Sequence, residues 1–193
     1  MLSSATTFAC FNAFLLITVL DISHDTKGVL SAALMSSAVS VGVLVGSVIA
    51  SLVVQRVPGG IVVVAFYLLM AVGSLGAAFA SQTVVRMAFL FASLLVFPAG
   101  NAVVGGFQTL LINKESLGKA AAGMGVIGMA VGPVVSALAG LGSERLGYTA
   151  TSFILTASIA VLALPALTLR GLITLPRPDQ WQQHIKRCGL TTF

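Results

Sequence analysis

The stretch IVVVAFYLLMAVGSLGAAFA, residues 61–80, carries no charged side chain. Five further stretches of this kind flank it, at residues 3–20, 29–54, 87–112, 120–142 and 149–169. A helix needs about 20 apolar residues to cross the hydrocarbon core of a bilayer, and every stretch is close to or above that length. A helix of a soluble protein would carry charge on the face that meets water. The pattern therefore predicts an all-α polytopic membrane protein with six transmembrane helices.

The composition argues against several other classes of protein. Hydrophobic residues make up 58% of the chain and charged residues 8%, whereas soluble domains contain about 25% charged residues. The net charge is +5, but the basic residues lie at the ends of the apolar stretches, where they set topology, and they form no patch for a nucleic acid. The expected partner is the lipid bilayer, with no nucleic acid.

The placement of the basic residues predicts the orientation of the chain. With six spans, both termini lie on the same side of the membrane. That side holds most of the basic residues: Arg56, Lys114, Lys119, Arg170, Arg177, Lys186 and Arg187. The opposite side holds Lys27, Arg86 and Arg145. Because cytoplasmic loops carry the excess of Lys and Arg, we predict a multi-pass protein of the cell (inner) membrane with both termini cytoplasmic. Residues 1–169 would form the transmembrane domain and residues 170–193 a cytoplasmic tail.

Glycines four residues apart occur in the second and the fifth stretch. The second contains Gly42 and Gly46, and the fifth contains Gly128, Gly132 and Pro133. These are equivalent positions if the chain consists of two three-helix units, and an odd number of spans inverts the second unit in the membrane, as in many transporters. Small residues at this spacing let helix backbones approach closely, so we expect the fifth helix to be central. Two interpretations stay open: packing alone, or a flexible point at Gly132 and Pro133.

No combination of side chains in the spans supports catalysis. The two histidines, His24 and His184, lie in an expected outer loop and in the tail. No Cys, His, Asp and Glu residues recur with metal-ligand spacing. We therefore expect a protein that is not an enzyme, with no cofactor and no metal.

Amide side chains are confined to two of the six stretches. Asn12 lies in the first, and Asn101 and Gln108 lie in the fourth. Asn101 and Gln108 are seven residues apart and share a helix face, close to a kink expected at Pro98. Because polar groups are costly in hydrocarbon, the three amides should face other helices or a wet cavity. Hydrogen bonding between helices and contact with a small molecule are both open.

These features together resemble the C-terminal half of a major facilitator superfamily transporter, of the bacterial drug-efflux and siderophore-export type. The resemblance covers roughly residues 1–181. It rests on the six spans, on Gly128-x3-Gly132-Pro133 in the fifth span, on the Gln55-Arg56 loop after the second, and on the ending Leu175-Pro176-Arg177-Pro178-x2-Trp181. The chain departs from the family pattern where Gln55 replaces the acidic residue of the loop motif.

The resemblance implies a fold and a function. The six spans would be a 3+3 inverted repeat, half of a twelve-helix transporter, and the first and fourth spans would line a central cavity. The implied substrate contacts are Asn12, Asn101, Gln108, Phe97 and Phe107. The implied packing and gating residues are Gly42, Gly46, Arg56, Gly128, Gly132 and Pro133. The expected activity is transport of a small, mostly apolar molecule by alternating access, in the direction of efflux.

The resemblance also implies a missing partner. Family members bind substrate between two six-helix halves, and this chain supplies one half without a charged residue inside the spans that would couple transport to protons. We expect a fragment that lacks an N-terminal half; a separately encoded partner half and a self-dimer are the other possibilities, as is a distinct six-helix protein. The alternative from another class is a membrane scaffold or partner subunit that transports nothing.

Overall fold

The computed structural model describes residues 2–23, 28–112, 116–168 and 175–181, and all of its regular secondary structure there is helical. The connections between helices are very short. The elements are α1 (Leu2–Ser23), α2 (Gly28–Arg56), α3 (Gly59–Phe79), α4 (Thr83–Leu110), α5 (Leu117–Leu146), α6 (Tyr148–Thr168) and the 3₁₀ turn η1 (Pro178–Gln180). The prediction of an all-α chain is therefore confirmed.

The helices follow the uncharged stretches but extend past several of them. Thus α4 includes Arg86, and α5 includes Lys119, Glu144 and Arg145 at its ends. Among the described residues, four helices are long and apolar enough to cross a membrane, and these are Thr6–Ser23, Gly28–Arg56, Gly59–Phe79 and Thr83–Leu110. The apolar part of α6, Tyr148–Leu164, is shorter.

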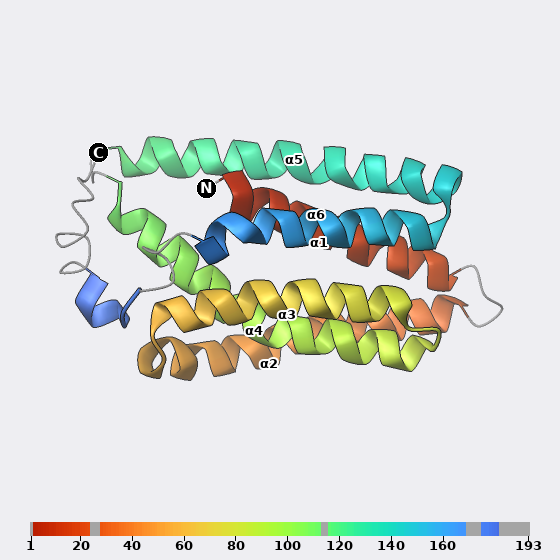
Figure 1. The fold of residues 1–193 in the computed structure, drawn as a ribbon, viewed down its shortest axis with the longest axis horizontal. Helices are drawn as coiled ribbons and strands as arrows, with labels where there is room; N and C mark the ends of the chain where they lie inside the picture. The colour runs from red at the N-terminus through yellow and green to blue at the C-terminus, as the bar shows by residue number, and fades with distance from the viewer. Residues whose placement is uncertain (1, 24–27, 113–115, 169–174, 182–193) are drawn as a thin grey trace.

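The helices run roughly side by side, and their connections gather at two opposite ends (Figure 1). The start of α1, the α2–α3 turn, the end of α4 and η1 lie at one end, and the α3–α4 and α5–α6 turns lie at the other. Contacts do not follow chain order. Helix α4 packs mainly on α2 and α3, α1 packs mainly on α5 and α6, and α3 contacts α6. The end that holds η1 is called the tail end below.

Glycines of α2 and α3 create the close packing around α4. A Cβ atom at Gly46 would lie 2.7 Å from the Leu95 carbonyl oxygen and 2.8 Å from that of Leu94. A Cβ at Gly42 would lie 3.2 Å from Cδ2 of Phe91. These distances leave no room for a larger residue, so the two backbones are in direct contact. Gly42 and Gly46, expected to act in helix packing or gating, thus lie at a close contact between α2 and α4.

On the α3 side of α4, glycine again permits the contact. The Gly73 backbone lies against Ser93, whose hydroxyl donates a hydrogen bond to the Leu69 carbonyl at 3.0 Å. Gly76 lies against the ring of Phe89, which a Cβ would approach to 2.6 Å. Helix α4 is thus enclosed by small residues of two neighbours, as expected where backbone approach replaces hydrophobic drive in a membrane.

The prediction that the fifth helix is central is wrong. A Cβ atom at Gly123, Gly125, Gly132 or Gly140 would meet no other atom within 4 Å. Pro133 is exposed, and Gly128 lies outside the side chains that the structure describes. The main contacts of α5 within the described residues are with α1 and α6. Gly125 and Gly132 are seven residues apart and therefore lie on one side of the helix, and we call this side the open face of α5.

Candidate substrate site

The site begins with the bend in α4. Pro98 lies inside this helix and has no N–H for the helical hydrogen-bond ladder. Figure 1 shows that α4 changes direction along its length, as proline inside a helix usually causes. The part of α4 after Pro98 therefore leaves the close packing with α2. Asn101 comes one turn after the proline, where this divergence makes space.

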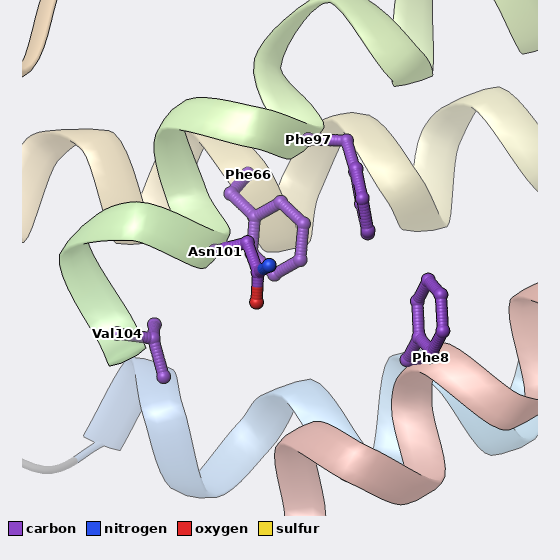
Figure 2. A pocket seen from close by; sticks show the side chains of 5 residues that line it. All are labelled: Phe8, Phe66, Phe97, Asn101 and Val104. Atoms are coloured by element: carbon purple, nitrogen blue, oxygen red, sulfur yellow. The ribbon is translucent and has the colours of Figure 1, made fainter. Parts of the chain in front are cut away.

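A small pocket of about 90 Å³ occupies this space. Its lining comes from three helices: Phe8 of α1, Phe66 of α3, and Phe97, Asn101 and Val104 of α4. The close-up in Figure 2 shows the three phenyl rings and the carboxamide of Asn101 around one opening. Because a cavity of about 150 Å³ is enough for one benzene molecule, the pocket can hold part of a small aromatic compound.

The phenyl rings pack against one another around the pocket. The rings of Phe8 and Phe97 are stacked, with centroids 5.3 Å apart and planes 23° apart. The rings of Phe66 and Phe97 are tilted, with centroids 5.9 Å apart. Phe66 reaches this position because its ring lies directly on Gly100, where any side chain would collide with it. Gly100 thus allows the Phe66 ring to form the third aromatic side of the pocket.

Among the described residues that line the pocket, Asn101 has the only polar side chain. It makes no hydrogen bond or ion pair with the described part of the chain, and it is exposed beside the Phe66 ring. A carboxamide offers two N–H donors and a carbonyl acceptor, and leaving them unpaired in apolar surroundings is costly. The arrangement can therefore bind a flat apolar group and hydrogen-bond one polar group on it.

The other residues expected to contact substrate lie around the pocket or away from it. Phe97 lines it. Asn12 is exposed on α1 one turn from Phe8, and its amide donates to the Phe8 carbonyl at 2.9 Å. Gln108 is half-buried two turns beyond Asn101 and does not line the pocket. Phe107 is buried against Trp181, with ring centroids 6.0 Å apart. A role in substrate contact for these three residues stays a prediction.

Sequence reasoning missed three lining residues: Phe8, Phe66 and Val104. Phe8 and Val104 could have been found, since they lie four residues before Asn12 and three residues after Asn101, on the same helix faces. Phe66 had no such signal, because it reaches the pocket only through its contact with Gly100. Arg56, expected to act in gating, is exposed at the end of α2 and forms no ion pair with the described residues.

A polar network lies near the opposite end of the helices. The guanidinium of Arg86 forms an ion pair with Asp21 at 2.7 Å, donates to the Ala80 carbonyl at 2.8 Å, and lies 4.8 Å from the centre of the Tyr148 ring. The Tyr148 and Thr18 hydroxyls are 3.3 Å apart. The network joins α1, α4 and α6. A wider opening of about 490 Å³ beside it is lined by Leu20, Asp21, Gly140, Ser143, Glu144 and Tyr148.

No group of three or more potential metal ligands occurs among the residues that the structure describes. Fold and composition define an all-helical protein, several of whose helices are suited to a membrane. No protein family, curated protein or solved structure matches the chain. The aromatic pocket with its unpaired amide is accordingly the feature from which a function must be argued.

Proposed function

We propose that this chain is one six-helix half of a secondary transporter that moves a small, mostly apolar molecule across the cell membrane by alternating access. The pocket between α1 and α4 carries the proposal. These two helices hold equivalent places in two three-helix units, and the pocket is the point where their aromatic side chains meet. Sites between repeats, near discontinuous or kinked helices, are common in transporters.

The exchange of neighbours between helices supports two related units. Helix α4 packs on α2 and α3, which belong to the first three-helix unit. Helix α1 holds the corresponding place in that unit, and it packs on α5 and α6 of the second unit. The contact between α3 and α6 maps onto itself when the two units are exchanged. Each unit thus places its first helix in the other unit, an arrangement expected for a 3+3 inverted repeat with all six helices in the membrane.

The size of the pocket and the open face of α5 support the proposal that this chain is half of a transporter and not a complete one. A pocket of about 90 Å³ is below the range of about 300–1,000 Å³ that is usual for complete sites. Along α5, no described atom lies within 4 Å of the Cβ positions of Gly125 and Gly132, so there is room for another helix on this side. A second six-helix unit would complete both features. It would be the missing half, a partner half or a second copy of this chain.

Ligand binding by Asn101 gives the direct test. The probe is 4-fluorobenzamide, a neutral ring with one amide, followed by ¹⁹F NMR with the purified chain in lipid nanodiscs and with empty nanodiscs as the partition blank. Asn101→Leu should weaken binding about tenfold, as expected for the loss of one hydrogen bond in an apolar site, about 1.4 kcal/mol. Thr109→Val is the matched control, since Thr109 is exposed on the same helix outside the pocket.

Transport is tested in the native host cells, where any partner half is present. Chromosomal Asn101→Leu should slow the efflux of the same compound while the amount of protein in the membrane is unchanged. Efflux at the wild-type rate would refute the assignment. The scaffold alternative makes the opposite prediction for the amides, since Leu would be tolerated at Asn12, Asn101 and Gln108. It shares the expectation that bulky residues at Gly128 and Gly132 are harmful.

A further inference from the structure

The end of α4 that carries the pocket is a weak helix on its own. Pro98 interrupts the hydrogen-bond ladder at its start. Gly100, Gly105 and Gly106 follow within two turns, and glycine lowers helix stability because of its conformational freedom. Unlike the first half of α4, this end is not held by glycine contacts with α2. Its position therefore depends on other contacts.

Some of those contacts come from α3, where the Phe66 ring lies on Gly100 and Gly59 lies near Val103. The others come from residues 175–181, which we call the C-terminal strap. Leu175 is 1% exposed and Trp181 is 6% exposed. The strap is fastened to the start of α3, where the first N–H groups of a helix have no partner within the helix. Gly59 N–H donates to the Pro176 carbonyl at 3.2 Å, and Gly60 N–H donates to the Leu175 carbonyl at 3.0 Å. This part of the expected tail is thus packed on the helices.

Within the strap, the indole of Trp181 is held in a fixed place. Its Nε1–H donates to the Pro176 carbonyl at 2.9 Å, the oxygen that also accepts from Gly59. The 3₁₀ turn η1 carries the chain back so that Trp181 and Pro176 lie side by side. The aromatic ring is therefore rigidly attached to the start of α3.

Trp181 packs against α4, the helix that carries Asn101 and Val104 of the pocket. A Cβ at Gly106 would lie 3.1 Å from Cζ3 of Trp181, and the Phe107 ring meets the indole edge to face at 6.0 Å. With 3.6 residues per turn, Gly106 lies about 140–160° around α4 from Asn101 and Val104, so the indole meets the helix on the side away from the pocket, while Phe107 lies between the two sides. One side of this short segment faces the pocket, and the other rests on the strap.

We infer that Trp181 is a positioning residue that holds the end of α4 against the pocket, so that release of the strap lets this end move outward and opens the pocket toward the tail end. The inference rests on the proposed function only for the use of the pocket; the control of α4 by the strap is a property of the chain itself. A segment outside the helices thereby sets how accessible the site is.

A thiol at the pocket reads out this movement without any ligand. In a chain with Cys10→Ala and Cys188→Ser, Asn101→Cys is labelled with a maleimide in nanodiscs. Trp181→Ala should raise the labelling rate about tenfold, since the rate follows the population of the opened state. Trp181→Phe should fall between the parent and Trp181→Ala, because it keeps one aromatic ring but loses the indole N–H and the outer indole atoms that lie against Gly106. The control thiol is Ser81→Cys, exposed at the other end of the helices.

Each outcome decides the inference. Equal labelling of Asn101→Cys with and without Trp181 would overturn it, and so would an equal rise at Ser81→Cys, which indicates general loosening. Trp181 is the only tryptophan, so its fluorescence gives a second measurement on the unaltered chain even if Trp181→Ala does not fold. Emission shifted to the blue and shielded from acrylamide is expected; free quenching would refute the packed strap. If the labelling behaves as expected but 4-fluorobenzamide does not bind, the strap stands and the transport proposal fails.

Discussion

Helices α4 and α5 are alike in sequence but are used in different ways. Both are long, rich in small residues and interrupted by one proline, Pro98 in α4 and Pro133 in α5. Glycines of α2 and α3 bring α4 into direct backbone contact with its neighbours, whereas among the described glycines of α5 only Gly142 has a close neighbour, Thr151 of α6. Glycine spacing therefore shows that a helix permits close approach. It does not show which helix approaches, or whether that helix belongs to the same chain.

Of the substitutions that test this difference between α4 and α5, Gly46→Leu should destabilise the protein most. The new side chain would start 2.7–2.8 Å from the carbonyl oxygens of Leu94 and Leu95, which cannot move unless α4 moves. Overpacking of this kind costs about 3 kcal/mol or more when backbone atoms are in the way. Unfolding in SDS mixed micelles measures the loss. Ser47→Leu, at an exposed neighbouring position, is the control, and equal stability of the two variants would contradict the close α2–α4 contact.

Gly132→Leu tests whether the open face of α5 is free of contacts within this chain. In the isolated chain it should leave the free energy of unfolding unchanged or raise it by up to about 1 kcal/mol, because leucine favours a helix more than glycine does and no described atom lies within 4 Å of the Cβ position. In host cells it should reduce efflux of 4-fluorobenzamide, because the side chain would fill the space that a second unit needs. A destabilised isolated chain would place another helix against α5, and normal efflux would mean that this face meets lipid alone.

Arg86→Gln should lower the free energy of unfolding by a smaller amount. Arg86 lies at the end of the helices away from the strap. The substitution removes the ion pair with Asp21 and the contact with the Tyr148 ring, which together are worth about 1–2 kcal/mol for a partly buried arginine. Exposed Arg145→Gln should cost less. A double-mutant cycle with Asp21→Asn in the same unfolding assay isolates the ion pair, and a coupling energy of zero would show that the network does not hold α1 to α4.

Much of the fold follows from the distribution of charge alone. Charged residues are excluded from the hydrocarbon, so the sequence places the helices within a few residues. Phe97 and Asn101, expected to contact substrate, line the same pocket. The position of α5 could not be found, because all six stretches are similarly apolar and no charge or polarity distinguishes a neighbouring helix from lipid. Phe66 and Trp181 depend on contacts with Gly100 and Gly106 of a distant helix, and such contacts leave no trace in the local pattern.

The turn between α5 and α6 has a consequence for how the chain is made. A single residue, Gly147, separates the two helices, with φ of 83°, a backbone region that glycine adopts without strain. Its N–H donates to the Ser143 carbonyl and its own carbonyl accepts from Thr151 N–H, at 3.1 and 3.2 Å, so the end of one helix is bonded to the start of the next. The connection is too short for one helix to move into the membrane while the other stays outside it during synthesis. If the chain crosses the bilayer six times, as we propose, α5 and α6 have to leave the insertion machinery together, as one hairpin.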